Sequence, residues 1–214
     1  KKLTDYLGAF DSVIWDWNGT LLDDIDTNLS CLRILLEKEK LPVPSREQYR
    51  NRFSFPVYDY YKGLGFDFSQ VSFADLAKDY IMAYEKNLVH AQLFKGTRDL
   101  LSSLSERGIK QFVLSAAEQN HLNRVLEDFS VASYFTGAYG LSDFQGESKV
   151  GASKRLIQDH SLDLSRTVLV GDTDHDLEVG KSMGVQVLLI ADGHQSYDRL
   201  YKVHDQVMNS RYDE

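Results

Sequence analysis

Two aspartates stand where short apolar segments of the sequence end. Asp16 closes the segment 13–15, and Asp172 follows the segment 168–170 and lies four positions before Asp176. Open parallel sheets bind their ligands beyond the carboxyl ends of the strands, so these aspartates are candidates for one shared site. Carboxylates gathered in this way repel one another unless a cation lies between them, and hard oxygen ligands suit Mg²⁺.

A hydroxyl and an ammonium complete the candidate set. Ser115 ends the apolar segment 112–114, and Lys149 precedes a helical pattern. A phosphoryl group needs such partners once a metal has neutralised part of its charge. Taken singly, each residue has a simpler explanation, because serine and aspartate often begin helices and lysine is usually solvated. In combination with the aspartates, these two residues indicate phosphoryl chemistry.

The elements that would position these residues alternate along the chain. Short apolar segments rich in β-branched residues predict buried strands at 10–16, 111–115, 167–170 and 185–190, with a weaker candidate at 134–141. Helical periodicity lies between them, with Thr97 as an expected N-cap and further apolar faces at 122–129 and after Lys149. This alternation predicts an α/β fold with a parallel sheet.

The segment 24–94 differs from the rest of the chain. It opens with an amphipathic stretch at 28–40, and it carries eleven aromatic residues between positions 49 and 84 without a strand pattern. We expect a helical insertion whose aromatic side chains mostly pack in its own core. The polar tail 196–214 predicts a loose terminal helix or coil.

Composition narrows the classes of partner. The chain has 214 residues and a net charge of −8, which argues against a nucleic-acid or membrane surface as partner. No apolar run is long enough for a transmembrane helix, and the start of the sequence lacks a signal-peptide pattern. The single cysteine, Cys31, permits no internal disulfide, so we expect a reducing, cytoplasmic location.

In order and spacing the motifs resemble those of the haloacid dehalogenase-like superfamily, and within it the phosphoglycolate phosphatase-like branch. The family's first motif, Asp-x-Asp-Gly-Thr, corresponds to residues 16–20, and its second to Ser115. Its third motif is a lysine, here Lys149, with Lys154 as the alternative. Its fourth motif, Gly-Asp-x-x-x-Asp, corresponds to residues 171–176.

The resemblance implies a Rossmann-like three-layer core with an inserted helical cap. The core would comprise residues 1–22 and 95–214, and the cap residues 23–94. It also implies an enzyme, a Mg²⁺-dependent phosphatase that acts on a small phosphorylated metabolite. The oligomeric state is not implied.

Residue roles follow from the same resemblance. Asp16 would be the nucleophile that forms an aspartyl-phosphate, with Asn18, Ser115 and Lys149 as the other catalytic residues. The metal would be held by Asp16, Asp172 and the backbone carbonyl of Asn18, with Asp176 supporting these ligands. Substrate oxygens would be bound by Asn18, Gly19, Thr20, Ser115, Ala116 and Lys149.

Asn18 departs from the family pattern, which has an aspartate there to protonate the leaving group. An amide cannot exchange a proton near neutral pH, and such help is worth about 10²–10⁴-fold in rate. Three hypotheses follow. In the first, the substrate has a good leaving group or is turned over slowly. In the second, His175 or Asp176 replaces the missing aspartate as the acid. In the third, the protein binds phosphate with weak or no turnover and acts as a regulator or scaffold.

Two other branches of the superfamily are weaker hypotheses. The phosphonate-cleaving branch has a small residue at position 18 and a cap lysine that forms a Schiff base, and no cap lysine here lies in an evidently desolvated context. The dehalogenase branch has an aromatic residue at position 18 and lacks the fourth motif. This chain has neither feature of that branch.

Overall fold

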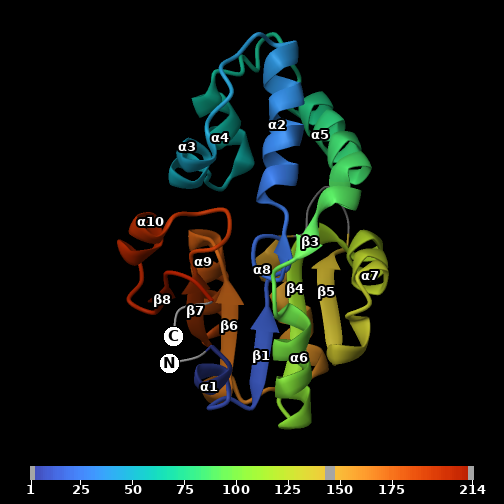
Figure 1. Ribbon diagram of the computed structural model, residues 1–214, viewed down its shortest axis with the longest axis vertical. Helices are drawn as coiled ribbons and strands as arrows, with labels where there is room; N and C mark the ends of the chain where they lie inside the picture. Colours follow the sequence, from blue (N-terminus) through green and yellow to red (C-terminus); the bar gives the residue numbers. More distant parts are fainter. Residues whose placement is uncertain (1–2, 143–147, 212–214) are drawn as a thin grey trace.

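The computed structural model describes residues 3–142 and 148–211 and contains a six-stranded parallel sheet (Figure 1). The order of its strands is β5-β4-β1-β6-β7-β8. The strands are β1 (Ser12–Trp15), β4 (Lys110–Glu118), β5 (Gly137–Leu141), β6 (Thr167–Gly171), β7 (Gln186–Ile190) and β8 (Val207–Met208). Strand β1 therefore lies in the interior of the sheet and pairs with both β4 and β6.

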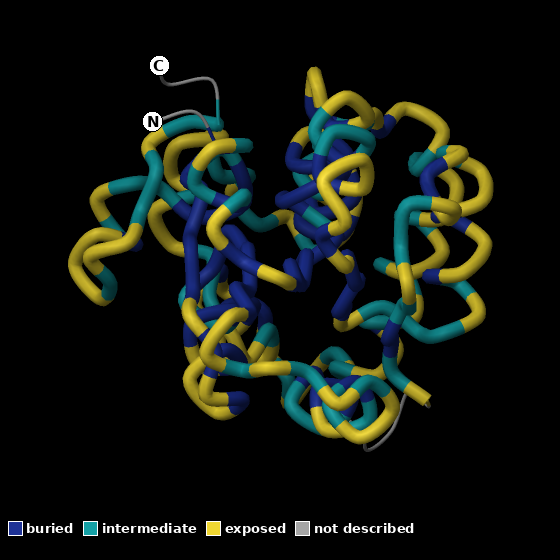
Figure 2. Tube along the Cα trace, turned by 90° about the horizontal axis from the view of Figure 1, so that it is seen from below, coloured by how far each residue is buried: buried dark blue, intermediate teal, exposed yellow. Residues whose placement is uncertain are grey.

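Successive residues of the strands face opposite sides of the sheet, and helices cover both sides. Val13 and Trp15 belong to the apolar cluster beneath α1 (Leu3–Leu7), α6 (Thr97–Glu106) and α7 (Gln119–Asp128). Ile14 belongs to the cluster beneath α8 (Lys149–Asp159), α9 (Asp174–Met183) and α10 (Tyr197–Tyr201). The buried backbone runs through the middle of the molecule with exposed segments around it (Figure 2). The predicted α/β three-layer core is thus confirmed.

A helical cap is inserted between β1 and β4 and stands above the carboxyl ends of the strands (Figure 1). Its helices are α2 (Ile25–Lys38), α3 (Arg46–Arg52), α4 (Val57–Leu64) and α5 (Phe73–Asn87). They enclose a separate apolar cluster that includes Tyr49, Tyr60 and Tyr61. An antiparallel pair, β2 (Leu22–Asp23) and β3 (Gln92–Leu93), carries the chain into and out of the cap. The boundaries at 22/23 and 94/95 stay a prediction.

One local prediction is wrong, and two others are confirmed only in part. Gly96, with φ of 77°, is the N-cap of α6; Thr97 is the first helical residue, and its buried hydroxyl has no hydrogen-bond partner. The chain at residues 132–134 forms a 3₁₀ turn, so β5 begins only at Gly137. The tail forms α10 and then β8, which pairs with β7. Strand β8 has two residues, which is too short for an alternating pattern to reveal.

Two further 3₁₀ turns, Leu88–His90 and Leu164–Arg166, connect neighbouring elements. Among the described residues, no helix has both the length and the apolar composition that crossing a bilayer requires.

Candidate active site

The predicted residues meet at the carboxyl ends of the central strands. Asp16 follows β1, Asp172 follows β6, and Asp176 lies in the first turn of α9. Each of these three buried aspartates offers a carboxylate oxygen, and the three oxygens lie within 4.8 Å of one another. The convergence follows from the register, since β6 pairs directly with β1. We refer to Asp16, Asp172, Asp176 and Lys149 as the phosphoryl cluster.

Lys149 joins two of these carboxylates. Its Nζ donates to Oδ1 of Asp16 at 2.5 Å and to Oδ1 of Asp176 at 2.6 Å. Its side chain is only 4% exposed, whereas Lys154 is exposed, so Lys149 is the lysine that reaches the site. Burial alone would lower the pKa of Lys149, but attraction to Asp16 and Asp176 outweighs burial and raises it. The side chain is therefore an ammonium at neutral pH.

The phosphoryl cluster carries more negative than positive charge. Burial raises the pKa of Asp16 well above its usual value; Lys149 opposes the rise, and repulsion from Asp176 and Asp172 adds to it. Burial also raises the pKa of Asp172. Three buried carboxylates facing one ammonium leave uncompensated charge, and their hard oxygens are the ligands that Mg²⁺ prefers. The donor set thus fits a divalent cation.

Asp176 differs from the other two carboxylates because both of its oxygens have partners. Its Oδ1 accepts from Lys149, and its Oδ2 accepts from the Thr173 hydroxyl at 2.7 Å and from the backbone N–H groups of Thr173 and Asp172. Burial alone would raise the pKa of Asp176, but Lys149 and these hydrogen bonds lower it. Thr173 and Asp176 form the capping box of α9, so Asp176 fixes this helix end and Lys149 together.

Thr20 and Gly19 hold the first motif against Asp172. The Thr20 hydroxyl lies 2.9 Å from Oδ1 of Asp172 and 3.3 Å from Oδ2 of Asp16. Gly19 has φ of +73°, and a Cβ on it would lie 2.3 Å from Oδ2 of Asp172. A side chain at position 19 would therefore be strained and would displace the carboxylate.

Ser115 and Ala116 lie beside the same point. Ser115 is buried, and its Oγ accepts from the backbone N–H of Ala117 at 3.1 Å. Both Ser115 and Ala116 line a cavity of about 420 Å³ that Asp16 and Lys149 also line. The cavity lies between core and cap, and its cap side includes Phe53, Phe55, Val57, Tyr80, Ile81 and Tyr84.

Asn18 also lines this cavity, and its amide group is engaged by the cap. Nδ2 of Asn18 donates to Oδ2 of Asp24 at 2.8 Å and to the hydroxyl of Tyr84 at 2.7 Å. The Tyr84 hydroxyl in turn donates to Oδ2 of Asp24 at 2.8 Å. Because a carboxylate only accepts, the nitrogen of the Asn18 amide must be the atom that faces Asp24.

Asp24 collects further donors and is fully buried. It accepts from the backbone N–H of Gly19 at 3.0 Å, from Nδ2 of Asn28 at 2.7 Å and from Nε2 of His194 at 3.1 Å. Burial alone would raise the pKa of Asp24, but His194 and the hydrogen bonds from Tyr84 and Asn18 lower it. We call Asp24 and its side-chain donors Asn18, Asn28, Tyr84 and His194 the Asp24 network.

His194 is the functional candidate that the sequence did not reveal, because it is one of six scattered histidines. Its backbone N–H donates to Oδ2 of Asp172 at 2.6 Å, and its Nδ1 lies 2.8 Å from the hydroxyl of Tyr49. Burial alone would lower the pKa of His194, but Asp24 raises it to about 9. A usable signal existed: His194 follows β7 at the same sheet edge as the motifs.

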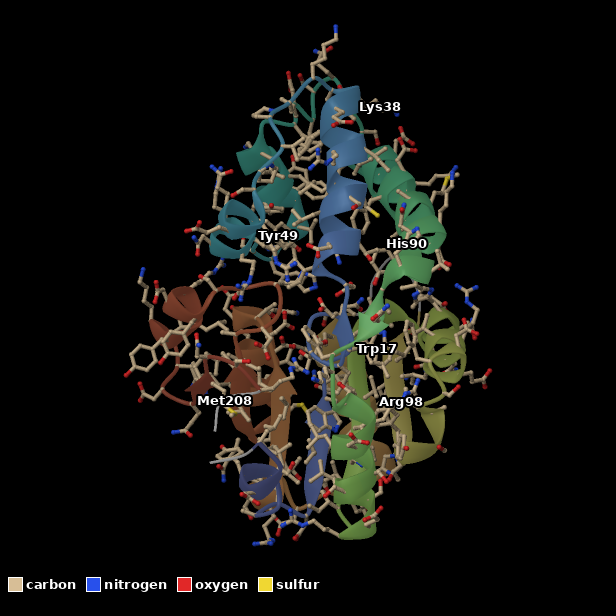
Figure 3. The ribbon with its side chains drawn as sticks, viewed as in Figure 1. Trp17, Lys38, Tyr49, His90, Arg98 and Met208 are labelled. Atoms are coloured by element: carbon tan, nitrogen blue, oxygen red, sulfur yellow. The ribbon has the colours of Figure 1, made fainter. Side chains whose placement is uncertain are left out.

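The network lies where cap and core meet. In Figure 3, Tyr49 lies at the end of the cap nearest the core, whereas Lys38 lies at the distant tip. Nearby, Nε of Arg50 donates to the Gly193 carbonyl at 2.9 Å, and Nε2 of Gln195 donates to the Phe53 carbonyl at 3.1 Å. The cap is therefore fastened to the loop that carries His194.

Comparisons with known proteins give a consistent family. Residues 13–190 match the family described as haloacid dehalogenase-like hydrolase. The tyrosine-protein kinase PtkA of Mycobacterium tuberculosis is 25% identical over 202 residues, which cover 92% of this chain and 67% of that protein. The phosphoglycolate phosphatase of Aquifex aeolicus is 22% identical over 189 residues, which cover 85% of each protein.

Solved structures share the fold. A haloacid dehalogenase-like family hydrolase from Streptococcus pneumoniae has a TM-score of 0.81 at 21% identity, and the match covers 95% of both chains. The family match spans most of this chain and includes all four motifs. These findings confirm the predicted superfamily, the similarity to its phosphoglycolate phosphatase-like branch and the predicted hydrolase class. The chain belongs to the haloacid dehalogenase-like hydrolase family.

Proposed function

We propose that the protein is a Mg²⁺-dependent phosphatase that hydrolyses a small phosphorylated metabolite through an aspartyl-phosphate on Asp16. The supporting observation is that Asp16, Asp172 and Lys149, from three separate segments, converge at one buried point that opens into a cavity. The names of the relatives also support chemistry at phosphoryl groups, since they include phosphatases and a tyrosine-protein kinase.

Asp16 and Asp172, with the backbone carbonyl of Asn18, are the proposed Mg²⁺ ligands, and Asp176 supports them through Lys149. A bound Mg²⁺ would neutralise the charge of the carboxylates and of the phosphoryl oxygens. An oxygen of Asp16 attacks phosphorus, and the bond from phosphorus to the leaving oxygen breaks. Water then hydrolyses the acyl phosphate, which releases inorganic phosphate and restores the Asp16 carboxylate.

Lys149 and Ser115 are proposed to bind the phosphoryl oxygens. The ammonium of Lys149 lies 2.5 Å from Oδ1 of Asp16, so the phosphoryl group that is transferred to Asp16 stays beside the ammonium. The backbone N–H groups at Asn18, Gly19, Thr20 and Ala116 are the proposed further donors. Fixed donors of this kind stabilise charge that develops in the transition state.

Asn18 leaves open which group, if any, protonates the leaving oxygen. Asp176 is a poor substitute because both of its oxygens already accept hydrogen bonds. His175 lines the cavity with its ring 4.8 Å from that of Phe55, so it stays a candidate acid. Phosphate binding with weak or no turnover is the alternative function. Phosphonate cleavage is disfavoured, since no cap lysine lines the cavity within the described part of the chain.

The test is release of phosphate from acetyl phosphate and p-nitrophenyl phosphate with and without Mg²⁺. We expect Mg²⁺-dependent turnover that Asp16→Asn lowers by at least about 10³-fold. Lys149→Ala should also lose activity, whereas the matched change Lys154→Ala, at an exposed lysine, should not. Turnover that survives Asp16→Asn would contradict the mechanism. No turnover of either compound would favour the binding or scaffold alternative.

A further inference from the structure

The cavity offers a leaving group apolar surface and few free polar partners. Phe53, Phe55, Val57 and Ile81 supply its apolar cap side. Phe55 and Ile81 are 38% and 44% exposed, so their side chains are accessible to an aromatic or aliphatic part of a ligand. An apolar pocket with few polar groups favours an apolar ligand body.

Apart from Glu85, the polar side chains on the cap side of the cavity bind one another or Asn18. The Tyr80 hydroxyl donates to the Asn28 side chain, and the Tyr84 hydroxyl donates to Asp24. The amide groups of Asn28 and Asn18 also donate to Asp24. Donors that are committed in this way are not available to recognise the hydroxyls of a sugar or polyol.

Charge at the cavity disfavours an anionic leaving group. Lys149 is the one lysine or arginine that lines the cavity within residues 3–142 and 148–211, and it is bonded to Asp16 and Asp176. Besides the buried aspartates, the carboxylates of Glu85 and Glu118 line the cavity. Glu85 is paired with Arg124 and His121, but Glu118 accepts only from backbone N–H groups at the start of α7. A substrate carboxylate, such as that of phosphoglycolate, would find no unpaired cation here.

Asn18 limits the substrate to one whose leaving group is acidic. Both hydrogens of its Nδ2 are donated, one to Asp24 and one to Tyr84, and an amide is no acid near neutral pH. A phenol has a pKa of about 10. Aliphatic alcohols are far weaker acids, with pKa values close to that of water. A phenolate therefore departs without a proton donor far more readily than an alkoxide does.

We infer that the preferred substrates are phosphate monoesters of phenols, whose leaving group is both apolar and acidic. This inference rests on the phosphatase function proposed above. Attack by an Asp16 oxygen breaks the bond between phosphorus and the phenolic oxygen, which keeps the electron pair and takes a proton from water. Hydrolysis of the acyl phosphate then expels the Asp16 carboxylate, a good leaving group that needs no acid.

The experiment compares four phosphates with the Mg²⁺-loaded wild-type protein. Phenyl phosphate has an acidic, apolar leaving group, benzyl phosphate an apolar alcohol, acetyl phosphate an acidic group without a ring, and phosphoglycolate an anionic alcohol. The ratio kcat/KM reports the first chemical step even if breakdown of the acyl phosphate limits kcat. We expect kcat/KM for phenyl phosphate to exceed that for benzyl phosphate and phosphoglycolate by about 10²-fold or more. The KM for phenyl phosphate should lie below the KM for acetyl phosphate, because acetyl phosphate has no ring to contact the apolar wall.

A matched pair of variants tests the apolar wall. Ile81→Lys places a cation in the cavity, and we expect it to raise the ratio of phosphoglycolate to phenyl phosphate turnover by about tenfold or more. Met82→Lys makes the same charge change at the next residue of α5, which is 63% exposed and does not line the cavity. It should leave the ratio unchanged. Equal shifts in both variants would contradict the proposed lining.

The outcomes separate the two proposals. Suppose that benzyl phosphate or phosphoglycolate is hydrolysed with the same kcat/KM as phenyl phosphate, and that Asp16→Asn abolishes this activity. The phosphatase function is then supported, and the preference for phenol esters is contradicted. Loss of benzyl phosphate turnover in His175→Gln would then identify His175 as the acid. If none of the four phosphates is hydrolysed with Mg²⁺, the phosphatase function falls, and the inference falls with it.

Discussion

Two groups of buried charge lie within the same cavity wall, and they are built in opposite ways. The phosphoryl cluster has three carboxylates and one ammonium, and burial raises the pKa of its Asp16. The Asp24 network has one carboxylate with four side-chain donors and one backbone donor, and the pKa of Asp24 is lowered. The first group is short of positive charge, whereas the second is complete without any ligand.

The difference separates chemistry from positioning. A carboxylate without enough donors is destabilised where it lies and gains when a cation or phosphoryl group arrives with its own partners. A carboxylate with a full set of donors resists change, so it suits a fixed junction. The Asp24 network joins Asn28 and Tyr84 of the cap to His194 of the core. Each of the following predictions tests one side of this contrast.

The largest effect is expected at the centre of the Asp24 network. Asp24→Asn should lower the free energy of unfolding by about 3–5 kcal/mol, because it removes the charge that pairs with the buried His194 and places an amide group among hydrogen-bond donors. Denaturant titration measures this loss. Asp23→Asn is the matched control at the adjacent, less buried position, and it should change stability by about 0.5 kcal/mol or less. Equal effects at both positions would remove the special role of Asp24.

The second effect is a pH dependence that His194 introduces. Its pKa rises from 6.5 to about 9 on folding, so the folded chain binds more protons than the unfolded chain between these values. Stability from this group is therefore complete below about pH 6.5 and is lost as pH rises through 9. The loss amounts to about 3 kcal/mol for a shift of this size.

Unfolding titrations between pH 6 and 10, with EDTA present, measure this decline. His194→Gln should remove the decline, whereas His90→Gln, at an exposed histidine of the cap, should preserve it. A decline of the same size in His194→Gln would assign it to other groups.

The third effect concerns the phosphoryl cluster. Mg²⁺ at about 100 times its dissociation constant should stabilise the wild-type protein by about 2.7 kcal/mol, because the cation binds only the folded chain. Asp172→Asn should abolish this shift in the denaturation midpoint, since it removes a proposed ligand. Asp23→Asn should keep the shift. Equal stabilisation of wild type and Asp172→Asn would place Mg²⁺ elsewhere.

The two groups also differ in how far the sequence reveals them. The phosphoryl cluster could be predicted from the sequence because Asp16, Ser115 and Asp172 lie at the ends of apolar strands, and a parallel sheet brings such ends together. Lys149 was also a candidate from the sequence, because an ammonium suits a phosphoryl group, but a lysine near a helix start is usually solvated, and Lys154 stayed the alternative. The structure then distinguished it from Lys154 by burial.

The Asp24 network could not be predicted from the sequence because its members come from elements that are far apart in the chain. Tyr84 lies in α5, His194 in the loop after β7, and their separation is set by how the cap packs on the core. No periodicity encodes such packing. The aromatic stretch of the cap was correctly expected to form a core, yet which aromatic side chains face the cavity depends on helix orientation. Strand β8 was not predicted because it is only two residues long.

The smallest effect has the opposite sign from the first and tests the contrast most directly. Asp16→Asn makes the same chemical change as Asp24→Asn, but within the phosphoryl cluster. Its oxygen can still accept from Lys149, and its nitrogen can donate to the Thr20 hydroxyl, which already lies closer to Asp172 than to Asp16. The variant removes uncompensated charge without orphaning a donor, so without Mg²⁺ it should be more stable than wild type by about 1 kcal/mol.

The size of this gain should depend on pH. Because the pKa of Asp16 is raised on folding, the folded wild type holds a proton that the unfolded chain has lost, and its stability falls as pH rises from acid toward that pKa. The advantage of Asp16→Asn should therefore vanish below about pH 4 and be larger near neutrality. Denaturant titration in EDTA at both pH values checks this. A loss of stability like that of Asp24→Asn would mean that both carboxylates are equally well partnered, and the contrast between the two groups would be wrong.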